Sequence, residues 1–395
     1  MCCAMTVSPP PYDAIILGAG AAGLMCALTA GRRGRRVLLL EHTDKAGAKI
    51  LISGGGRCNF TNLAITPERF LSDNPHFATS ALRRYTQGDF IAMVQRHHIA
   101  FHEKTLGQLF CDGSARAIVG MLLQECAAGG VDLRLGQTIS AVTKPDQFRV
   151  ETTAGTFTAP ALVLATGGLS IPKMGATGLA YDFAKQFGLR IIPARPGLVP
   201  FKAANADAAM AGVSLDAIAS FGRQSFRENI LFTHRGLSGP AILQISSYWR
   251  PGEAITLDLL PGHDAAAFLT GRKRARPKAA PQTVLAELLP SRLAQALTVA
   301  HLPPGELANI PDKALAVFAG VLKAWEFRPS GTEGYAKAEV TAGGIDTRDL
   351  SSKTMEARGL PGLYAIGEAV DVTGWLGGYN FQWAWSSGWS AGETV

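Results

Sequence analysis

The pattern of apolar and polar positions is most regular in residues 12–41. An apolar run with high β propensity, 12–17, leads into the glycine-rich stretch 18–23, and then a helical stretch and a second apolar run end at Glu41. This order predicts a strand, a tight turn, a helix and a second strand. Because the glycines have the spacing Gly-x-Gly-x-x-Gly in that context, the stretch is typical of the βαβ unit that binds dinucleotides. The alternative is a strand-turn-helix unit with chance glycines.

Each part of this unit has a physical task in holding a dinucleotide. Gly18 permits the tight turn, Gly20 lets a pyrophosphate approach the backbone, and Gly23 lets the helix pack closely on the strand. The start of the helix offers free N–H groups and a positive dipole to the phosphates. Glu41 can accept hydrogen bonds from both ribose hydroxyls and would repel a 2′-phosphate.

Two further glycine-rich segments indicate which dinucleotide binds. Residues 53–62 contain three consecutive glycines before Arg57, and their exposed amides suit a pyrophosphate or the polar edge of a flavin ring. Near the other end, a short buried strand at 362–366 precedes a turn, and residues 377–380 open an apolar helix. A glycine-rich helix start favours the negative charge that develops on a reduced flavin. These segments predict FAD, lying across a Rossmann domain that the C-terminal residues complete.

Helices and strands are expected to alternate through the rest of the chain. Helices are predicted at 77–85, 89–97, 116–128 and 177–187. Strands of a small meander are predicted at 131–135, 138–143, 148–153 and 156–159. Residues 163–168 are expected to return a strand to the main sheet, and 193–200 to form an exit linker. The region that follows alternates like strands to about Pro261 and is then helical over 265–325.

Five sequence blocks, in this order, resemble one known family. They are Ser53-Gly54-Gly55-Gly56-Arg57-Cys58-Asn59, Ala165-Thr166-Gly167-Gly168, Phe232 to Pro240, Thr341-Ala342-Gly343-Gly344, and Gly367-Glu368 through Gly377-Gly378-Tyr379-Asn380-Phe381-Gln382-Trp383. Over residues 12–392 the chain resembles the YhiN/BaiN-like NAD(P)/FAD-dependent oxidoreductases. It departs from the family pattern around Leu109-Phe110-Cys111, where a basic residue and a proline are usual, and in the spacing of Lys45 and Lys49.

The resemblance implies an α/β protein with a discontinuous Rossmann-type FAD-binding domain, an inserted β-rich domain and a small helical domain. The expected bounds are 12–195 with 336–395, then 196–262, then 263–335. The residues expected to bind FAD are Gly18, Gly20, Ala21, Ala22, Gly23, Glu41, His42, Lys49, Ser53, Gly54, Gly55, Gly56, Arg57, Cys58, Asn59, Ala165, Thr166, Gly167, Gly367, Glu368, Gly377, Gly378, Tyr379, Asn380 and Phe381. Binding is expected to be non-covalent, because His42 follows the ribose-binding acid and lies at the wrong end of FAD for attachment to the ring.

Composition agrees with a multidomain enzyme. With 395 residues, of which 47% are apolar and 17% charged, the chain exceeds a single core. The six cysteines lack metal-ligand spacing, so no metal site and no disulfide framework are expected, and a reducing cytoplasm fits best. Residues 1–5 lack the basic and apolar regions of a signal peptide, and no apolar run reaches the length of a membrane span.

The net charge of +7 is compatible with a nucleic-acid partner. Four arginines fall within residues 32–36, where the first helix is expected to end, and a solvated helix cap explains them. A second cluster is expected in a surface loop of the insertion, and its basic residues are Arg272, Lys273, Arg274, Arg276 and Lys278. For that loop, a solvated linker and a contact with RNA phosphates both remain open.

In a flavoenzyme the flavin carries the hydride, so the protein must position the substrate and supply a proton. Cys58 is the first candidate proton donor, because the resemblance places its loop beside the cofactor; a small packing residue is the alternative. His234, in a turn of the β-rich insertion, is either a second acid or substrate anchor, or a structural histidine. Tyr379 and Asn380 are expected to touch the flavin ring, Asn380 by a hydrogen bond; the alternative is that they only cap the helix. The tryptophans Trp375, Trp383 and Trp385 either wall the pocket or belong to the core.

A second Gly-x-Gly-x-x-Gly stretch is absent from the sequence, so NAD(P)H is expected to dock transiently as the electron donor. Relatives in the family have been linked to reduction of uracil to dihydrouridine in ribosomal RNA, to steroid enone reduction and to amine oxidation. The basic balance favours the first, an NAD(P)H-driven reduction of an activated C=C bond. The alternatives are an amine or amino-ketone oxidase that uses O2, and a flavin-loaded RNA-binding or redox-sensing protein without enzymatic activity.

Overall fold

The computed structural model describes residues 11–395, which form two compact units. The first unit joins the residues up to Arg195 to Val340–Val395, and the second is Pro196–Glu339. The expectation about a signal peptide concerns residues 1–5 and lies outside the described residues. Among residues 11–395, no helix is long and apolar enough to cross a membrane.

The first unit is built on a parallel five-stranded sheet in the order β21-β11-β1-β2-β7. In that order, the strands are Leu363–Ala365, Ala161–Leu164, Ala14–Leu17, Val37–Leu40 and Asp132–Arg134. Strands β1, β2 and β11 are buried along their whole length, as continuous apolar runs predict for a parallel sheet covered on both faces. Leu17 pairs with Leu40 on one side and Leu164 on the other, so these strands end together. Ligands of such sheets bind beyond this carboxyl edge.

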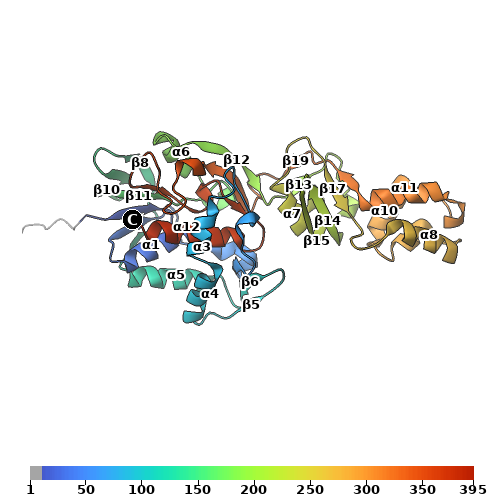
Figure 1. Cartoon of the computed structure of the whole chain (residues 1–395), viewed down its shortest axis with the longest axis horizontal. Helices are drawn as coiled ribbons and strands as arrows, with labels where there is room; N and C mark the ends of the chain where they lie inside the picture. Colours follow the sequence, from blue (N-terminus) through green and yellow to red (C-terminus); the bar gives the residue numbers. More distant parts are fainter. Residues whose placement is uncertain (1–10) are drawn as a thin grey trace, which may run out of the picture. The chain divides into compact units, whose positions relative to one another are not determined.

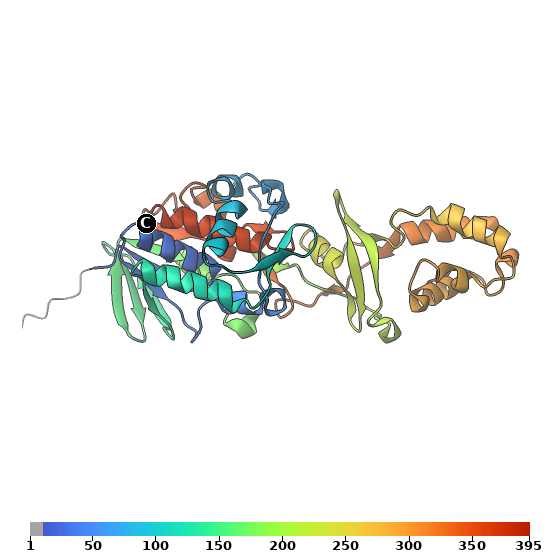
Figure 2. The same cartoon turned by 90° about the horizontal axis from the view of Figure 1, so that it is seen from below.

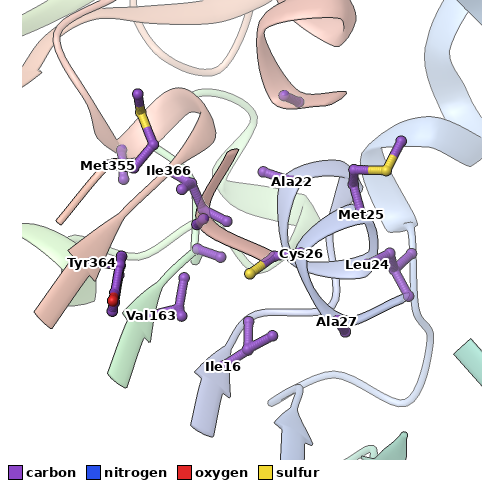
Figure 3. Packing of buried hydrophobic residues seen from close by; sticks show 14 of the residues in the cluster. Ile16, Ala22, Leu24, Met25, Cys26, Ala27, Val163, Met355, Tyr364 and Ile366 are labelled. Carbon is purple, nitrogen blue, oxygen red and sulfur yellow. The ribbon is translucent and has the colours of Figure 1, made fainter. Parts of the chain in front are cut away.

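Three helices pack together beside this sheet: α1 (Ala21–Arg32), α5 (Arg116–Ala128) and α12 (Tyr379–Gly392). Helices α1 and α12 come from opposite ends of the chain and lie side by side in both Figure 1 and Figure 2. They approach closely because Gly388 has no side chain; a Cβ there would lie 2.5 Å from the Ala22 carbonyl oxygen. Figure 3 shows Cys26 on the sheet side of α1, where it joins Ile16 and Val163 in one buried cluster.

Smaller elements surround this core. The other helices of the first unit are α2 (Ala48–Ile52), α3 (Ala78–Arg84), α4 (Gln87–Arg96) and α6 (Leu179–Gln186). The antiparallel strands are β8 (Ile139–Thr143), β9 (Phe148–Thr152) and β10 (Gly155–Ala159) in one sheet, and β3 (Asn59–Asn62), β6 (Gln108–Cys111) and β5 (Phe101–Glu103) in another. Two short pairs complete the unit: β4 (Phe70–Leu71) with β22 (Thr373–Gly374), and β12 (Ile191–Gly197) with β20 (Val340–Ile345).

Two predictions about strands were wrong. Residues 131–135 do not belong to the meander, because α5 returns the chain to the main sheet and β7 pairs in parallel with β2. Only β8, β9 and β10 form the antiparallel three-stranded sheet. Residues 193–200 were expected to be a linker, but most of them belong to β12, which pairs with β20.

The second unit is a seven-stranded antiparallel sheet in the order β18-β17-β14-β15-β16-β13-β19. Its strands are Trp325–Phe327, Ile255–Asp258, Ser214–Phe221, Gln224–Thr233, Gly236–Ser238, Phe201–Lys202 and Gly331–Thr332. Strands β14 and β15 form the long hairpin in Figure 2, and α7 (Pro240–Ser246) packs on it.

A helical segment is inserted between β17 and β18 of this sheet. It contains α8 (Ala265–Ala275), α9 (Pro281–Leu285), α10 (Ser291–His301) and α11 (Asp312–Lys323). Helix α11 packs on β17 and β18, so the segment is joined to the edge of the sheet. The helical domain was expected to extend to residue 335. Its last helix, α11, ends at Lys323, and the strands β18 and β19 that follow belong to the sheet.

Candidate cofactor site

The turn between β1 and α1 has the geometry that its glycine spacing predicts. Gly18 adopts a φ of +103°, and a Cβ there would lie 2.6 Å from the Ala165 carbonyl oxygen. A Cβ on Gly23 would lie 1.9 Å from the Gly18 carbonyl oxygen, so only glycine lets α1 approach the turn. A Cβ on Gly20 would meet no atom within 4 Å, and no side chain of residues 11–395 caps α1 there. The N-terminus of α1, with Ala21 and Ala22, is thus open to an anion.

Glu41 closes this turn from the end of β2. Its side chain is buried; one carboxylate oxygen accepts a hydrogen bond from the Ala19 N–H at 2.9 Å, and the other accepts from the N–H and the hydroxyl of Thr43, both at 2.9 Å. His42 is exposed, with its Nδ1 3.0 Å from the same carboxylate. The acid predicted to bind ribose therefore lies beside the glycine turn, at the carboxyl edge of the sheet.

The end of β11 contributes an unsatisfied polar atom. Ala165 lies against Gly18, and Gly167 has a φ of +76° with open space where a Cβ would be. Between them, Thr166 Oγ1 is buried and has no hydrogen-bond partner among residues 11–395. Buried hydroxyls normally have a partner, so this atom fits a contact with a bound ligand.

Lys49 and Glu368 form the charged centre of the site. The Lys49 ammonium donates to Glu368 Oε2 at 2.6 Å and to Ser170 Oγ at 2.7 Å. Glu368 Oε1 accepts from the Ser170 hydroxyl at 2.6 Å and from the Thr341 N–H at 2.9 Å. Burial alone would raise the pKa of Glu368, but the charge of Lys49 and these hydrogen bonds together hold it below its ordinary value. Glu368 is therefore a fixed anion rather than a base.

Replacing Lys49 tests this ion pair. Lys49→Met is expected to lower the free energy of unfolding by about 1–2 kcal/mol near neutral pH, since the carboxylate loses its charged donor while partial exposure screens the pair. A lowered pKa means that ionised Glu368 stabilises the fold above pH 4.5, its ordinary value, and that this contribution is lost as the pH falls further. The difference in free energy of unfolding between wild type and Lys49→Met, measured by urea unfolding, should therefore become smaller toward acid pH. Lys45→Met, at an exposed lysine nearby, is the matched control; equal effects of both variants would contradict the assignment.

The glycine loop that follows α2 is left-handed at nearly every position. Gly54, Gly55 and Gly56 have φ values of +57°, +67° and +85°, and Cys58 follows at +53°. Arg57 is exposed, whereas Cys58 is fully buried, and burial raises the pKa of its thiol to about 12. The loop therefore presents glycine backbone and one cation at its surface and keeps a protonated thiol beneath. Ser53 starts this loop and Asn59 begins β3 after it.

The start of α12 lies against strands β3 and β6. Gly377 and Gly378 have φ values of +101° and +95°; a Cβ on Gly378 would lie 2.4 Å from the Thr61 carbonyl oxygen, and one on Gly377 would meet the Gln108 side chain at 2.9 Å. No side chain of the described residues caps this helix start. It therefore offers a second positive helix terminus to a ligand.

The polar side chains at the start of α12 are engaged within the protein. The Asn380 amide accepts from the Gly374 N–H and donates to the Gly374 carbonyl, both at 2.9 Å. The amide oxygen keeps a second lone pair, so the hydrogen bond expected between Asn380 and a flavin stays a prediction. Tyr379 is buried and its hydroxyl donates to the Ala64 carbonyl at 3.2 Å.

The aromatic residues of α12 belong mainly to the core. Trp383 and Trp385 are buried, and their indole N–H groups donate to the carbonyls of Gly367 at 2.9 Å and Phe60 at 2.8 Å. The sequence left open whether these tryptophans wall the pocket or belong to the core; Trp383 and Trp385 belong to the core. Phe381 is partly buried and stacks on Trp385, and the Arg69 guanidinium lies 5.2 Å from the centre of the Trp375 ring.

Sequence reasoning missed three polar residues of this site. Ser170 and Thr341 hold Glu368, and the buried Asn62 donates to the Gly377 carbonyl at 2.9 Å. Thr341 and Asn62 each stand inside a block that the sequence singled out, but a side chain's partner depends on distant segments. Only the structure shows which hydroxyl and amide face the glycine turns.

The remaining expected residues lie in the second unit. His234 is exposed in the turn between β15 and β16. The basic cluster was expected in a loop, but Arg272, Lys273 and Arg274 form the last turn of α8, where cations complement the helix dipole. Three of the basic residues make ion pairs: Arg272 and Arg276 with Glu287, and Lys273 with Asp312. Arg274 and Lys278 are exposed.

The residues of the first unit fit FAD. The uncapped starts of α1 and α12 and the open face over Gly20 suit a dinucleotide with a charged middle and a ring that gains negative charge. The buried, unpartnered Thr166 hydroxyl and the cation Lys49 are further groups that could contact such a ligand. Segments far apart in the sequence thus each supply features that suit such a ligand.

Comparison with known proteins gives close relatives over nearly the whole chain. The family described as "HI0933-like protein Rossmann domain" matches residues 12–394. The chain is 51% identical to a ribosomal RNA dihydrouridine synthase of Escherichia coli, with 97% of this chain and 98% of that protein covered, and 46% identical to a protein of the same name from Haemophilus influenzae, with 96% and 98% covered. It is also 30% identical to a 3-dehydro-bile acid delta(4,6)-reductase of Clostridium scindens, with 96% and 98% covered.

Proposed function

Since the chain belongs to the HI0933-like flavoprotein family, we propose that it reduces uracil to dihydrouridine in ribosomal RNA. Membership confirms the prediction of a flavoprotein oxidoreductase and implies FAD as the cofactor. The observation that supports this substrate is the 51% identity, over nearly the full length of both chains, to a ribosomal RNA dihydrouridine synthase. The bile-acid relative is named as a reductase, which favours reduction over oxidation of a substrate.

FAD, when bound, supplies the hydride for this reaction. We assign its pyrophosphate to the start of α1 over Gly20, and its ribose hydroxyls to Glu41, the acid beside that turn. The flavin ring is assigned to the glycine loop 54–56 and to Gly377 and Gly378 at the start of α12. The sequence has no second dinucleotide fingerprint, which supports transient docking of NAD(P)H as the source of electrons.

Reduction of the uracil C5=C6 bond adds a hydride to one carbon and a proton to the other. We propose Cys58 as the proton donor, because its loop carries the proposed flavin contacts. The thiol has no exposed surface, so contact with uracil requires the loop 54–58 to move. His234 is the alternative acid or substrate anchor.

Cys58→Ala is expected to keep FAD bound and to be reduced by NAD(P)H at the normal rate, but to form dihydrouridine about 100-fold more slowly. Stopped-flow absorbance follows flavin reduction, and mass spectrometry of digested RNA follows the product. The matched control is Cys111→Ala, which removes another buried thiol of raised pKa. If Cys58→Ala formed dihydrouridine at the wild-type rate, Cys58 would be a packing residue and not the proton donor.

We propose that Arg274 and Lys278 contact RNA phosphates, because they are exposed whereas their neighbours are held by Glu287 and Asp312. The double substitution Arg274→Ala with Lys278→Ala is expected to weaken RNA binding and to reduce the slope of log affinity against log salt by about 1–2. Filter binding over a salt series measures both. Arg227→Ala, at an exposed arginine paired with Asp216, is the control. An unchanged slope would show that α8 does not contact the RNA.

The function is tested by incubating ribosomal RNA that lacks dihydrouridine with the protein, FAD and NAD(P)H, and by measuring dihydrouridine in the digest. We expect product only when a reduced nicotinamide is present. Rapid peroxide release with amines, and no product from RNA, would instead support the oxidase alternative. RNA binding with no reaction of either kind would support the non-enzymatic alternative. Because ribosomal RNA is the proposed substrate, we place the activity in the cytoplasm.

A further inference from the structure

The hairpin of β5 and β6 carries an exposed apolar tip. Leu106 has 62% of its surface exposed, the highest value among the large apolar side chains described in the first unit. Leu63, with 46% exposed, lies next to it, because its N–H donates to the Gly107 carbonyl at 2.8 Å. The two leucines form a small exposed apolar patch at the tip of a hairpin whose other exposed side chains are polar.

The tip is also held in a strained conformation. Leu106 has a φ of +50°, which residues other than glycine, asparagine and aspartate rarely adopt. Three hydrogen bonds fix it there: Gln108 N–H to the Thr105 carbonyl, Lys104 N–H to the Gln108 carbonyl, and Gly107 N–H to Glu103 Oε1. The backbone therefore projects Leu106 from a rigid turn.

One buried side chain connects this tip to the proposed flavin contacts. The Asn62 amide donates to the Leu106 carbonyl at 3.1 Å and to the Gly377 carbonyl at 2.9 Å. Gln108, two residues after Leu106, packs against Gly377. The Asn62 side chain thus holds both Leu106 and the glycine turn at the start of α12.

The surroundings of the tip are polar and include one anion, Glu103, whose carboxylate binds the Gly107 N–H, and one cation, Lys104. The exposed Lys104 lies on the same hairpin, with its ammonium 5.3 Å from the centre of the Phe110 ring. Phe110 in turn lies against Gly54 of the glycine loop. An apolar wedge beside a cation suits a nucleic-acid strand, in which a phosphate lies next to each stacked base.

We propose that Leu106, supported by Leu63, is a wedge that enters the base stack of the RNA and fills the place of the uracil that moves to the flavin. This inference rests on the proposed function. Enzymes that act on a stacked base must extrude it, and apolar side chains inserted between bases offset the cost of unstacking. Leu106 is a positioning residue in this account, since it contacts the neighbouring bases and not the reacting carbon.

The test compares a stacked substrate with an unstacked one. Leu106→Ala is expected to form dihydrouridine at least about tenfold more slowly in folded ribosomal RNA, and at the wild-type rate in short oligouridylate, where little stacking is lost. Leu106→Met should retain most of the activity because it keeps the apolar volume. Leu106→Gly should lose as much as Leu106→Ala while its melting temperature does not fall, because glycine accepts the positive φ. The matched control is Leu135→Ala, an exposed leucine at the end of β7.

A second readout does not depend on activity. An RNA hairpin with 2-aminopurine beside an unpaired uridine should brighten when wild-type protein binds, and should not brighten with Leu106→Ala. Equal losses of Leu106→Ala on both substrates, or no loss on either, would overturn the wedge. So would a change confined to the oligomeric state of the protein, which would place the leucines in a protein interface. Unstacking by wild-type protein that forms no dihydrouridine would support the wedge and refute the proposed function instead.

Discussion

Gly20→Val is expected to weaken FAD binding by about 100-fold or more while leaving the apoprotein folded. The new side chain would stand in the open space over the start of α1, where the pyrophosphate is assigned, and would displace the phosphates from the helix N-terminus. A 100-fold loss corresponds to about 2.8 kcal/mol of binding free energy. The backbone tolerates valine, since Gly20 has an extended conformation with a φ of −79° and no atom lies within 4 Å of its Cβ position.

Fluorescence titration of apoprotein with FAD measures the affinity, and urea unfolding without FAD measures stability. Gly359→Val is the matched control, because Gly359 is exposed and a Cβ there also meets no atom within 4 Å. Wild-type affinity in Gly20→Val would mean that the pyrophosphate does not lie over this turn.

Gly23→Ala should instead damage the fold, by about 3 kcal/mol or more in the free energy of unfolding of the apoprotein. Its Cβ would lie 1.9 Å from the Gly18 carbonyl oxygen, a distance that no side-chain rotation relieves. Helix α1 would have to move away from the turn. It would then lose packing against α12, which it approaches closely at Gly388.

The two substitutions separate binding from packing at neighbouring glycines. Gly20→Ala, which meets no atom within 4 Å, is the control for Gly23→Ala and should leave stability within about 1 kcal/mol of wild type. If Gly23→Ala were as stable as Gly20→Ala, the close approach of α1 to the turn would be wrong.

Local patterns were sufficient to predict the parallel strands that carry the glycine turn. The apolar runs before Gly18 and before Glu41 are short, continuous and followed by turn residues, so they predicted buried parallel strands without knowledge of their partners. The glycines at 18 and 23 were interpreted correctly for the same reason. Their roles depend on residues a few positions away.

Long-range pairings were not predictable in this way. Strand β7 was assigned to the wrong sheet, because three residues do not reveal whether a strand pairs in parallel with β2 or antiparallel with β8. The basic residues of α8 were expected in a surface loop, and their ion pairs were not predicted because Glu287 and Asp312 lie outside the cluster in the sequence. Ser170 was not predicted either, because the sequence around a single serine does not show that it will form hydrogen bonds with Lys49 and Glu368.

In the proposed reaction, electrons pass from the flavin to uracil in ribosomal RNA. The most direct measurement is a single turnover without oxygen: FAD-loaded protein is reduced with one equivalent of NAD(P)H and mixed with ribosomal RNA that lacks dihydrouridine, while flavin absorbance is recorded. We predict that the oxidised-flavin bands return and that dihydrouridine forms in equal amount. A flavin that stays reduced with this RNA, and is reoxidised only when air is admitted, would contradict the account.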